Sequence, residues 1–278
     1  MPVETVFSSD LSRRQASEAR FHDAWAEEVD FTQIDPAIAF EAETALENRL
    51  ILKRIGSMQG LRILDLGCGA GEAAVYFAQH GAHVSACDIS PRFVEIARQL
   101  AERHGVTLRL DVCPAERLPY EDGAFDVIYA NGVLHHVEIP AAMPEIRRVM
   151  AEGGRGFFIE PLPYNPLINL YRWIAREVRT PDERPLGRAD CRAIARVFPK
   201  MRIDYVWFFT LLVFVYFFVV ERASTAERYW KKILYQADRY AWLFRPLQAL
   251  DEALLPRLPM LGLLCWNMVI QVTRPPAR

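Results

Sequence analysis

The segment Ile63–Glu72 constrains the fold of this 278-residue chain more than any other. Its sequence, ILDLGCGAGE, is a short apolar run followed by glycines at alternate positions, Gly67, Gly69 and Gly71. A strand that leads through such a loop into a helix brings the backbone close to a ligand, because glycine has no Cβ. The helix start presents unpaired N–H groups at the same place. We therefore expect a strand–loop–helix unit that binds a ligand.

Short apolar runs alternate with amphipathic segments on both sides of this unit. The runs typical of strands lie at residues 62–66, 83–87, 106–112, 125–130, 155–160, 201–209 and 264–273. Helical patterns separate the first five runs at about residues 72–80, 90–103 and 141–150. Alternation at this spacing predicts an α/β fold with a parallel, doubly wound sheet. We expect a Rossmann-like, seven-stranded and mostly parallel sheet.

Three segments exceed what such a sheet needs. Residues 1–55 carry two amphipathic helical patterns and predict an N-terminal helical cap. Residues 56–278 would form the sheet domain, with helical insertions at 161–189 and about 206–260. Ligands in open α/β sheets bind outside the carboxyl ends of the strands, so the insertions are expected to recognise the substrate.

Two acidic residues indicate which class of cofactor the sequence favours. Glu72 stands where the dinucleotide fingerprint has Gly or Ala, and an acid at a helix start would repel a pyrophosphate. Asp88 ends the second predicted strand, where a carboxylate can accept both hydroxyl groups of a ribose. Its alternative role is to cap the helix that starts at Pro91, which Ser90 suits better. The pattern favours a ligand that has a ribose and no phosphate.

Five motifs follow one another in unbroken order: DLGCGAG at 65–71, ACDIS at 86–90, AERLPY at 115–120, FDVI at 125–128 and VLHH at 133–136. Together they resemble the class I S-adenosylmethionine-dependent methyltransferases. More narrowly, they resemble the type 11 group, which includes ubiquinone-type methyltransferases. The resemblance covers roughly residues 60–160. It implies methyl transfer from S-adenosyl-L-methionine, with S-adenosyl-L-homocysteine as the product.

The resemblance also implies which residues surround the methionine part of the cofactor. The expected contacts come from one loop, formed by Asp65, Gly67, Cys68, Gly69 and Gly71. Asp65 would orient the ammonium group through water or backbone. Asn131, at the end of the fourth strand, would lie near the sulfonium.

The nucleoside part would lie against the next two motifs. The resemblance implies that Asp88 holds the ribose hydroxyls and that Ile89 packs on one face of the adenine. Ala115 and Glu116 would reach the adenine edge through backbone N–H groups. The family usually has Asp just before that Ala, and here Pro114 takes its place. Glu116 or a water would have to replace this contact.

Four residues are candidates for catalysis. A base is needed if the acceptor is a hydroxyl or an activated carbon, and His135 and His136 follow the fourth strand directly. His22 is a further candidate if the N-terminal helix closes over the cofactor. Glu160, at the end of the fifth strand, is a candidate for substrate contact. Capping or packing is the structural alternative for each histidine.

No metal is expected to take part in the reaction, because the sulfonium methyl is already activated. The cysteines are widely spaced and form no C-x-x-C pair, which indicates neither zinc nor a disulfide framework. A net charge of −2 gives no field that would attract nucleic acid. The polar N-terminus lacks the apolar core of a signal peptide, so we expect a cytoplasmic protein.

The acceptor is the least defined part of the prediction. The apolar run Val206–Val220 has 15 residues, short of the ~20 that cross a bilayer. Buried core, the wall of an apolar pocket, and a peripheral membrane or homo-oligomer contact are its three interpretations. Two helix faces carry arginines at one-turn spacing, and they are either solvated or form an anion site: Arg172, Arg176 and Arg179, and Arg188, Arg192 and Arg196.

We therefore expect C- or O-methylation of a hydrophobic small molecule or lipid-like acceptor, such as a quinone, polyketide or isoprenoid. Two alternatives stay open at this point. One is an isoprenoid diphosphate C-methyltransferase, and the other is a non-catalytic subunit that binds S-adenosylmethionine.

Overall fold

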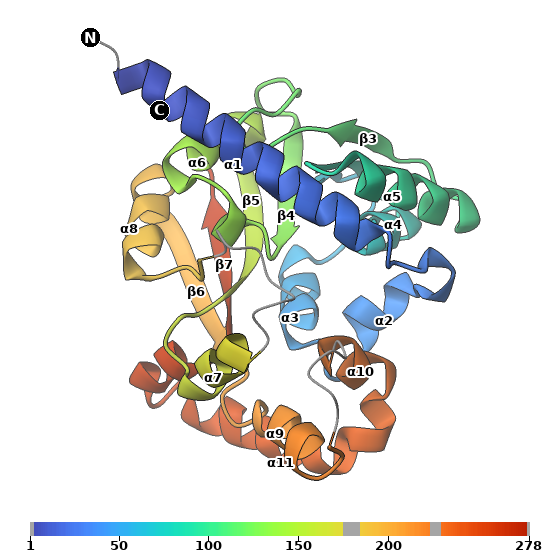
Figure 1. The fold of residues 1–278 in the computed structure, drawn as a ribbon, viewed down its shortest axis with the longest axis vertical. Helices are drawn as coiled ribbons and strands as arrows, with labels where there is room; N and C mark the ends of the chain where they lie inside the picture. Colours follow the sequence, from blue (N-terminus) through green and yellow to red (C-terminus); the bar gives the residue numbers. More distant parts are fainter. Residues whose placement is uncertain (1–2, 175–183, 223–228, 277–278) are drawn as a thin grey trace.

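The computed structural model describes residues 3–174, 184–222 and 229–276. Its centre is a seven-stranded sheet in the order β3-β2-β1-β4-β5-β7-β6 (Figure 1). The strands are β1 Arg62–Leu66, β2 His83–Asp88, β3 Arg109–Val112, β4 Phe125–Asn131, β5 Met150–Pro161, β6 Lys200–Val206 and β7 Asn267–Thr273. Neighbouring strands from β3 to β5 pair in parallel, whereas β7 pairs antiparallel with both β5 and β6. The prediction of a Rossmann-like, mostly parallel sheet is confirmed.

Helices cover both faces of this sheet, as the near-continuous apolar strands require. On one face, Ile63 and Val127 pack with α4 (Glu72–Gln79). On the other, Leu64 and Ile128 pack with α6 (Ile139–Val149) and α8 (Arg188–Val197). The helix α5 (Pro91–Arg103) follows β2. Strand β3 begins three residues later than predicted, because the chain from Gly105 to Leu108 is used to close the end of α5, where the Val106 N–H donates to the carbonyl of Ala101.

The N-terminal segment that precedes β1 is helical. Its elements are α1 Val3–Ala26, the short 3-10 helix η1 Phe31–Gln33, α2 Pro36–Glu41 and α3 Leu46–Ile55. Phe40 of α2 stacks on Tyr76 of α4 at 4.3 Å between ring centroids, and Ile51 of α3 is fully buried in the same cluster as β1. The end of the segment at residue 55 is therefore not a boundary between two cores. Helix α1 crosses over the sheet and packs against α5 (Figure 1).

The remaining helices gather at the far end of the molecule and build a second apolar cluster (Figure 1). They are α7 Pro166–Ile174, α9 Leu212–Val219, α10 Tyr229–Tyr235, α11 Ala237–Leu254 and the 3-10 helix η4 Pro259–Leu264. The apolar run Val206–Val220 is divided between a strand and a helix. β6 ends at Val206, and in α9 the side chains of Val213 and Phe217 are completely buried. Val219 and Val220 are exposed. Among the described residues, we find no helix with the length and apolar character needed to cross a membrane.

One buried carboxylate joins these helices to the sheet. Asp251 of α11 accepts hydrogen bonds from the backbone of Phe209 (2.7 Å) and of Thr210 (3.1 Å), and from the Thr210 hydroxyl (2.7 Å). The N–H of Phe208 also donates to it at 3.3 Å. These donors lie in the turn between β6 and α9, so Asp251 fixes the direction in which α9 leaves the sheet.

We expect Asp251→Ala to lower the free energy of unfolding by about 2–4 kcal/mol, because buried donors lose their acceptor. Denaturant unfolding measures this change. Glu252→Ala is the matched control, since the neighbouring Glu252 is exposed and accepts a hydrogen bond from the side chain of Gln248. Equal losses in the two variants would contradict the assignment.

Candidate active site

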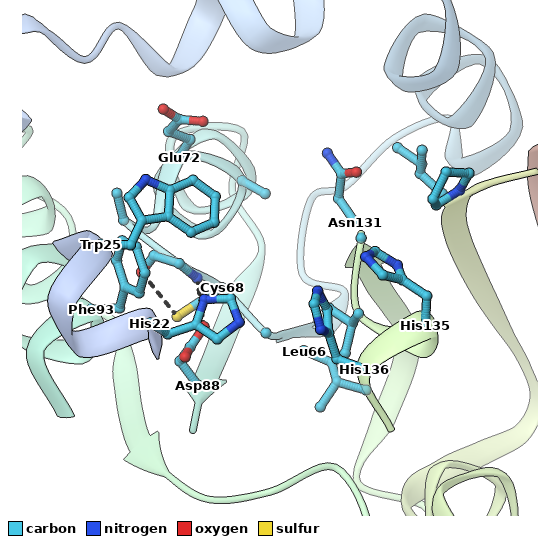
Figure 2. Close-up of a pocket in the computed structure, with 18 of the residues that line it drawn as sticks. His22, Trp25, Leu66, Cys68, Glu72, Asp88, Phe93, Asn131, His135 and His136 are labelled. Atoms are coloured by element: carbon cyan, nitrogen blue, oxygen red, sulfur yellow. Dashed lines mark hydrogen bonds between the residues drawn. The ribbon is translucent and has the colours of Figure 1, made fainter. Parts of the chain in front are cut away.

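A cavity of about 830 Å³ opens at the carboxyl ends of β1, β2 and β4. Helix α1 borders it on one side, and α7, α9 and α10 contribute to its far wall. The residues predicted to bind cofactor line this one cavity, with the exception of Gly71; they are Asp65, Gly67, Cys68, Gly69, Asp88, Ile89, Ala115, Glu116 and Asn131. Figure 2 shows Cys68 and Asp88 on one side of the opening and Asn131 with His135 and His136 on the other.

The loop Gly67–Gly71, called the glycine loop below, needs glycine both for close packing and for its backbone conformation. Gly67 and Gly71 have positive φ angles of 68° and 86°. A Cβ on Gly67 would lie 2.4 Å from the Val133 side chain, and one on Gly71 would lie 2.8 Å from Ala97. A Cβ on Gly69 would meet nothing within 4 Å. Gly67 and Gly71 therefore let the loop pack against its neighbours, and Gly69 faces open space.

Asp88 closes this loop from the end of β2. Its carboxylate accepts from the N–H of Gly69 and from the N–H of Ser90, both at 2.9 Å. Burial raises the pKa of Asp88, and the two N–H groups oppose that rise. Ser90 caps α5 by accepting from the N–H of Phe93, so the cap is Ser90 and not Asp88, as predicted.

Asp65 is a buried acid that points to the same cavity. Only 2% of its surface is exposed, and its Oδ2 atom accepts no hydrogen bond from any described residue. Burial raises the pKa of Asp65 to about 7, and the charges of Asp88 and Glu72 add to the rise. A buried carboxylate with an unpaired oxygen favours a cationic or N–H-donating partner.

The cavity as a whole is acidic. The carboxylates that line it outnumber the arginines: Glu18, Glu28, Glu47, Asp65, Glu72, Asp88 and Glu116 against Arg14 and Arg172. Arg14 forms an ion pair with Glu138, a residue that does not line the cavity. Such a lining favours a cationic ligand and disfavours a polyanion.

The predicted catalytic residues divide into two groups. His135 is 8% exposed and borders the cavity, and its Nδ1 lies 2.7 Å from Oε2 of Glu160. Oε1 of Glu160 accepts from the N–H groups of Val133 (3.0 Å) and Leu134 (2.6 Å). Glu160 is fully buried and does not line the cavity. The Glu160 side chain therefore contacts His135 and not the space that a substrate would occupy, in contrast to the prediction.

His22 and His136 also line the cavity, and they meet at a third residue that the sequence did not indicate. Their ring centroids are 5.4 Å apart, and both approach Glu18 of α1. The i, i+4 spacing of Glu18 and His22 on one helix was the available signal. It is weak alone, because the partner His136 lies more than a hundred residues away.

The wall of the cavity beside α9 is aromatic, with Trp207, Phe214 and Trp266. Phe40 and Tyr129 also line the cavity, but they pack with Phe77 of α4, the helix that follows the glycine loop. Trp207 and Phe214 lie 5.4 Å apart between centroids, and Phe214 and Trp266 lie 5.0 Å apart. The run 206–220 thus serves partly as core and partly as cavity wall.

Of the predicted arginine rows, Arg176 and Arg179 lie outside the described residues, and Arg172 borders the cavity.

Comparisons with known proteins agree with this geometry. Residues 64–158 match the family described as "Methyltransferase domain". The chain is 30% identical over 178 residues to the ubiquinone biosynthesis O-methyltransferase of Bordetella parapertussis, which covers 63% of this chain and 70% of that protein. It is 26% identical over 163 residues to a sterol 24-C-methyltransferase of Gibberella zeae, covering 57% of this chain and 40% of that one.

The chain belongs to the class I S-adenosylmethionine-dependent methyltransferases of the type 11 group. A solved structure with a similar fold is geranyl diphosphate C-methyltransferase from Streptomyces coelicolor, in complex with Mg²⁺, geranyl diphosphate and S-adenosyl-L-homocysteine. Its TM-score is 0.57 at 17% identity, over 84% of this chain and 80% of that one, which supports the fold alone. The cofactor of this methyltransferase is S-adenosylmethionine.

We expect S-adenosyl-L-homocysteine to bind this methyltransferase more tightly as pH rises through about 7. Below that pH Asp65 is protonated, and above it the carboxylate is ionised and attracts the ligand's ammonium group. Calorimetry between pH 6 and 8 measures the change.

Asp65→Asn should bind more weakly and lose this pH dependence. Asp126→Asn is the control, because Asp126 pairs with Arg62 at the amino ends of β4 and β1, away from the cavity. A pH dependence that persists in Asp65→Asn would contradict the role given to Asp65.

Proposed function

We propose that this methyltransferase methylates a hydroxyl group on an uncharged, largely apolar small molecule. The observation that carries the proposal is the continuity of one cavity from the glycine loop to the aromatic wall. A donor bound at the loop and an apolar acceptor bound against the rings would meet inside it. Holding two reactants in line in this way contributes up to roughly 7–11 kcal/mol to such a reaction.

The cofactor half fits the cationic donor. Asp65 would attract the ammonium group, and the open space in front of Gly69 would let the methionine part approach the loop backbone. Asp88, held by Gly69 and Ser90, would accept the ribose hydroxyls, with Ile89 against the adenine. In the same arrangement, Ala115 and Glu116 would border the adenine edge, and Asn131 the sulfonium. The side chain of Glu116 already bonds the N–H of Glu138 and the amide of Gln15.

The acceptor half favours an uncharged molecule over an isoprenoid diphosphate. The rings of Trp207, Phe214 and Trp266 would recognise an apolar body mainly through buried area. A diphosphate would instead meet a lining in which carboxylates outnumber two arginines. Of these two, Arg14 pairs with Glu138, and Arg172 donates to the Leu162 carbonyl and to Asn169. The named relatives act on a ubiquinone precursor and on a sterol, and both names fit a large apolar acceptor.

The His135–Glu160 pair supplies the base in this proposal. Nδ1 of His135 donates to the buried carboxylate, which leaves the lone pair of the neutral imidazole on Nε2. S-Adenosylmethionine, when bound, would supply an activated methyl group for displacement by the acceptor oxygen, forming an O–C bond as the C–S bond breaks and leaving S-adenosyl-L-homocysteine. His135 would take the hydroxyl proton on Nε2. His22 and His136 stay further candidates for contact with the acceptor.

Catalytic efficiency should rise along a series of phenols that carry progressively longer isoprenoid tails. Each methylene that becomes buried contributes about 0.8 kcal/mol, or roughly fourfold in kcat/KM, until the cavity is filled. Phe214→Ala should flatten the series without changing S-adenosyl-L-homocysteine binding. Leu212→Ala, exposed on the same helix, is the control. If short polar phenols or an isoprenoid diphosphate proved the best acceptor, the proposal would be wrong.

Glu160→Gln should lower kcat by about a hundredfold or more, because its amide would donate to Nδ1 of His135 and place the ring proton on Nε2. The affinity for S-adenosyl-L-homocysteine should stay unchanged, which separates lost chemistry from misfolding. Glu152→Gln, exposed on the same strand, is the matched control. An unchanged kcat in Glu160→Gln argues against a histidine base.

A further inference from the structure

Three potential metal ligands meet in the wall of the cofactor cavity. Glu18 and His22 lie one turn apart on α1, and His136 belongs to η2 (Leu134–His136), which follows β4. One ligand atom from each residue lies within 4.8 Å of the others. Figure 2 shows His22 on the side of Asp88 and His136 beside His135, and the centroids of the His22 and His136 rings lie 5.4 Å apart.

The Glu18 carboxylate is buried without the donors that a buried anion needs. It is 4% exposed, and neither of its oxygens accepts a hydrogen bond from a described residue. Its Oε2 lies 3.2 Å from Nδ1 of His136 and 3.6 Å from Nε2 of His22. Nδ1 of His136 is likewise buried without a hydrogen bond. A cation placed among the three would satisfy all of these atoms.

We propose that Glu18, His22 and His136 bind a divalent transition-metal ion of the zinc class. Two imidazole nitrogens with one carboxylate suit Zn²⁺ or Co²⁺, whereas Mg²⁺ and Ca²⁺ prefer oxygen ligands alone. Bonds of about 2.1 Å place tetrahedral ligand atoms about 3.4 Å apart, so small side-chain rotations complete the site. The ion ties α1 to the turn that carries His135. The ion would lie in the wall of the cavity, and its binding does not depend on which acceptor is used.

Cobalt is the direct probe, because Co²⁺ bound by nitrogen and oxygen ligands absorbs visible light and Zn²⁺ does not. The full chain is stripped with chelator and titrated with Co²⁺. One equivalent should bind with a d–d absorption band, and Zn²⁺ should displace it. Glu18→Gln, His22→Gln and His136→Gln should each weaken Co²⁺ binding by about tenfold or more. His83→Gln, an exposed histidine at the start of β2, should bind as the unaltered chain does.

S-Adenosyl-L-homocysteine binding and thermal unfolding are measured on the same samples, so that a variant that fails to fold is recognised. The unaltered chain decides the question even if every variant unfolds. A chain that binds S-adenosyl-L-homocysteine but shows no stoichiometric Co²⁺ band overturns the metal site and leaves the methyltransferase function standing. Binding that persists in all three variants, or that is lost equally in His83→Gln, also overturns it.

Discussion

The close approach of the glycine loop to the chain after β4 is the contact on which the rest of the site depends. Gly67 has no Cβ, and this leaves room for Val133. The N–H of Val133 is in turn held by Glu160, the carboxylate that also holds His135. A side chain at position 67 would displace Val133 and with it the candidate base. The cofactor loop and the catalytic turn are therefore one packed unit.

The two halves of the cavity differ in charge and in apolar character. Asp65, Asp88 and Glu72 lie at the cofactor half, and the unpaired oxygen of Asp65 is costly until a cation arrives. The aromatic half offers area and excludes water, which strengthens the electrostatic interactions inside it. A cationic donor and an uncharged acceptor thus suit different ends of the same space. The Glu18 cluster lies at the border, where α1 meets the turn after β4.

Local sequence signals predicted the sheet, the glycine loop and the position of Asp88, because strand period, glycine spacing and the Ser90 cap each act over a few residues. The other cofactor contacts were implied by the family resemblance and stay predictions. Contacts between distant segments could not be predicted in this way. Glu18 meets His136, and Asp251 meets Thr210, only because helices dock in a particular register. Glu160 was expected to face the substrate. It turns inward instead, because two buried N–H groups and His135 need an acceptor.

The position of the transferred methyl group tests the central claim most directly. The full chain would be incubated with S-adenosylmethionine that carries a ¹³C-labelled methyl group and with a phenol that bears an isoprenoid tail. Carbon NMR of the product then separates a methyl on oxygen from a methyl on carbon. Transfer to an uncharged apolar acceptor with a base at His135 predicts a labelled methoxy group. A labelled methyl on carbon, or product formed only from an isoprenoid diphosphate, would contradict it.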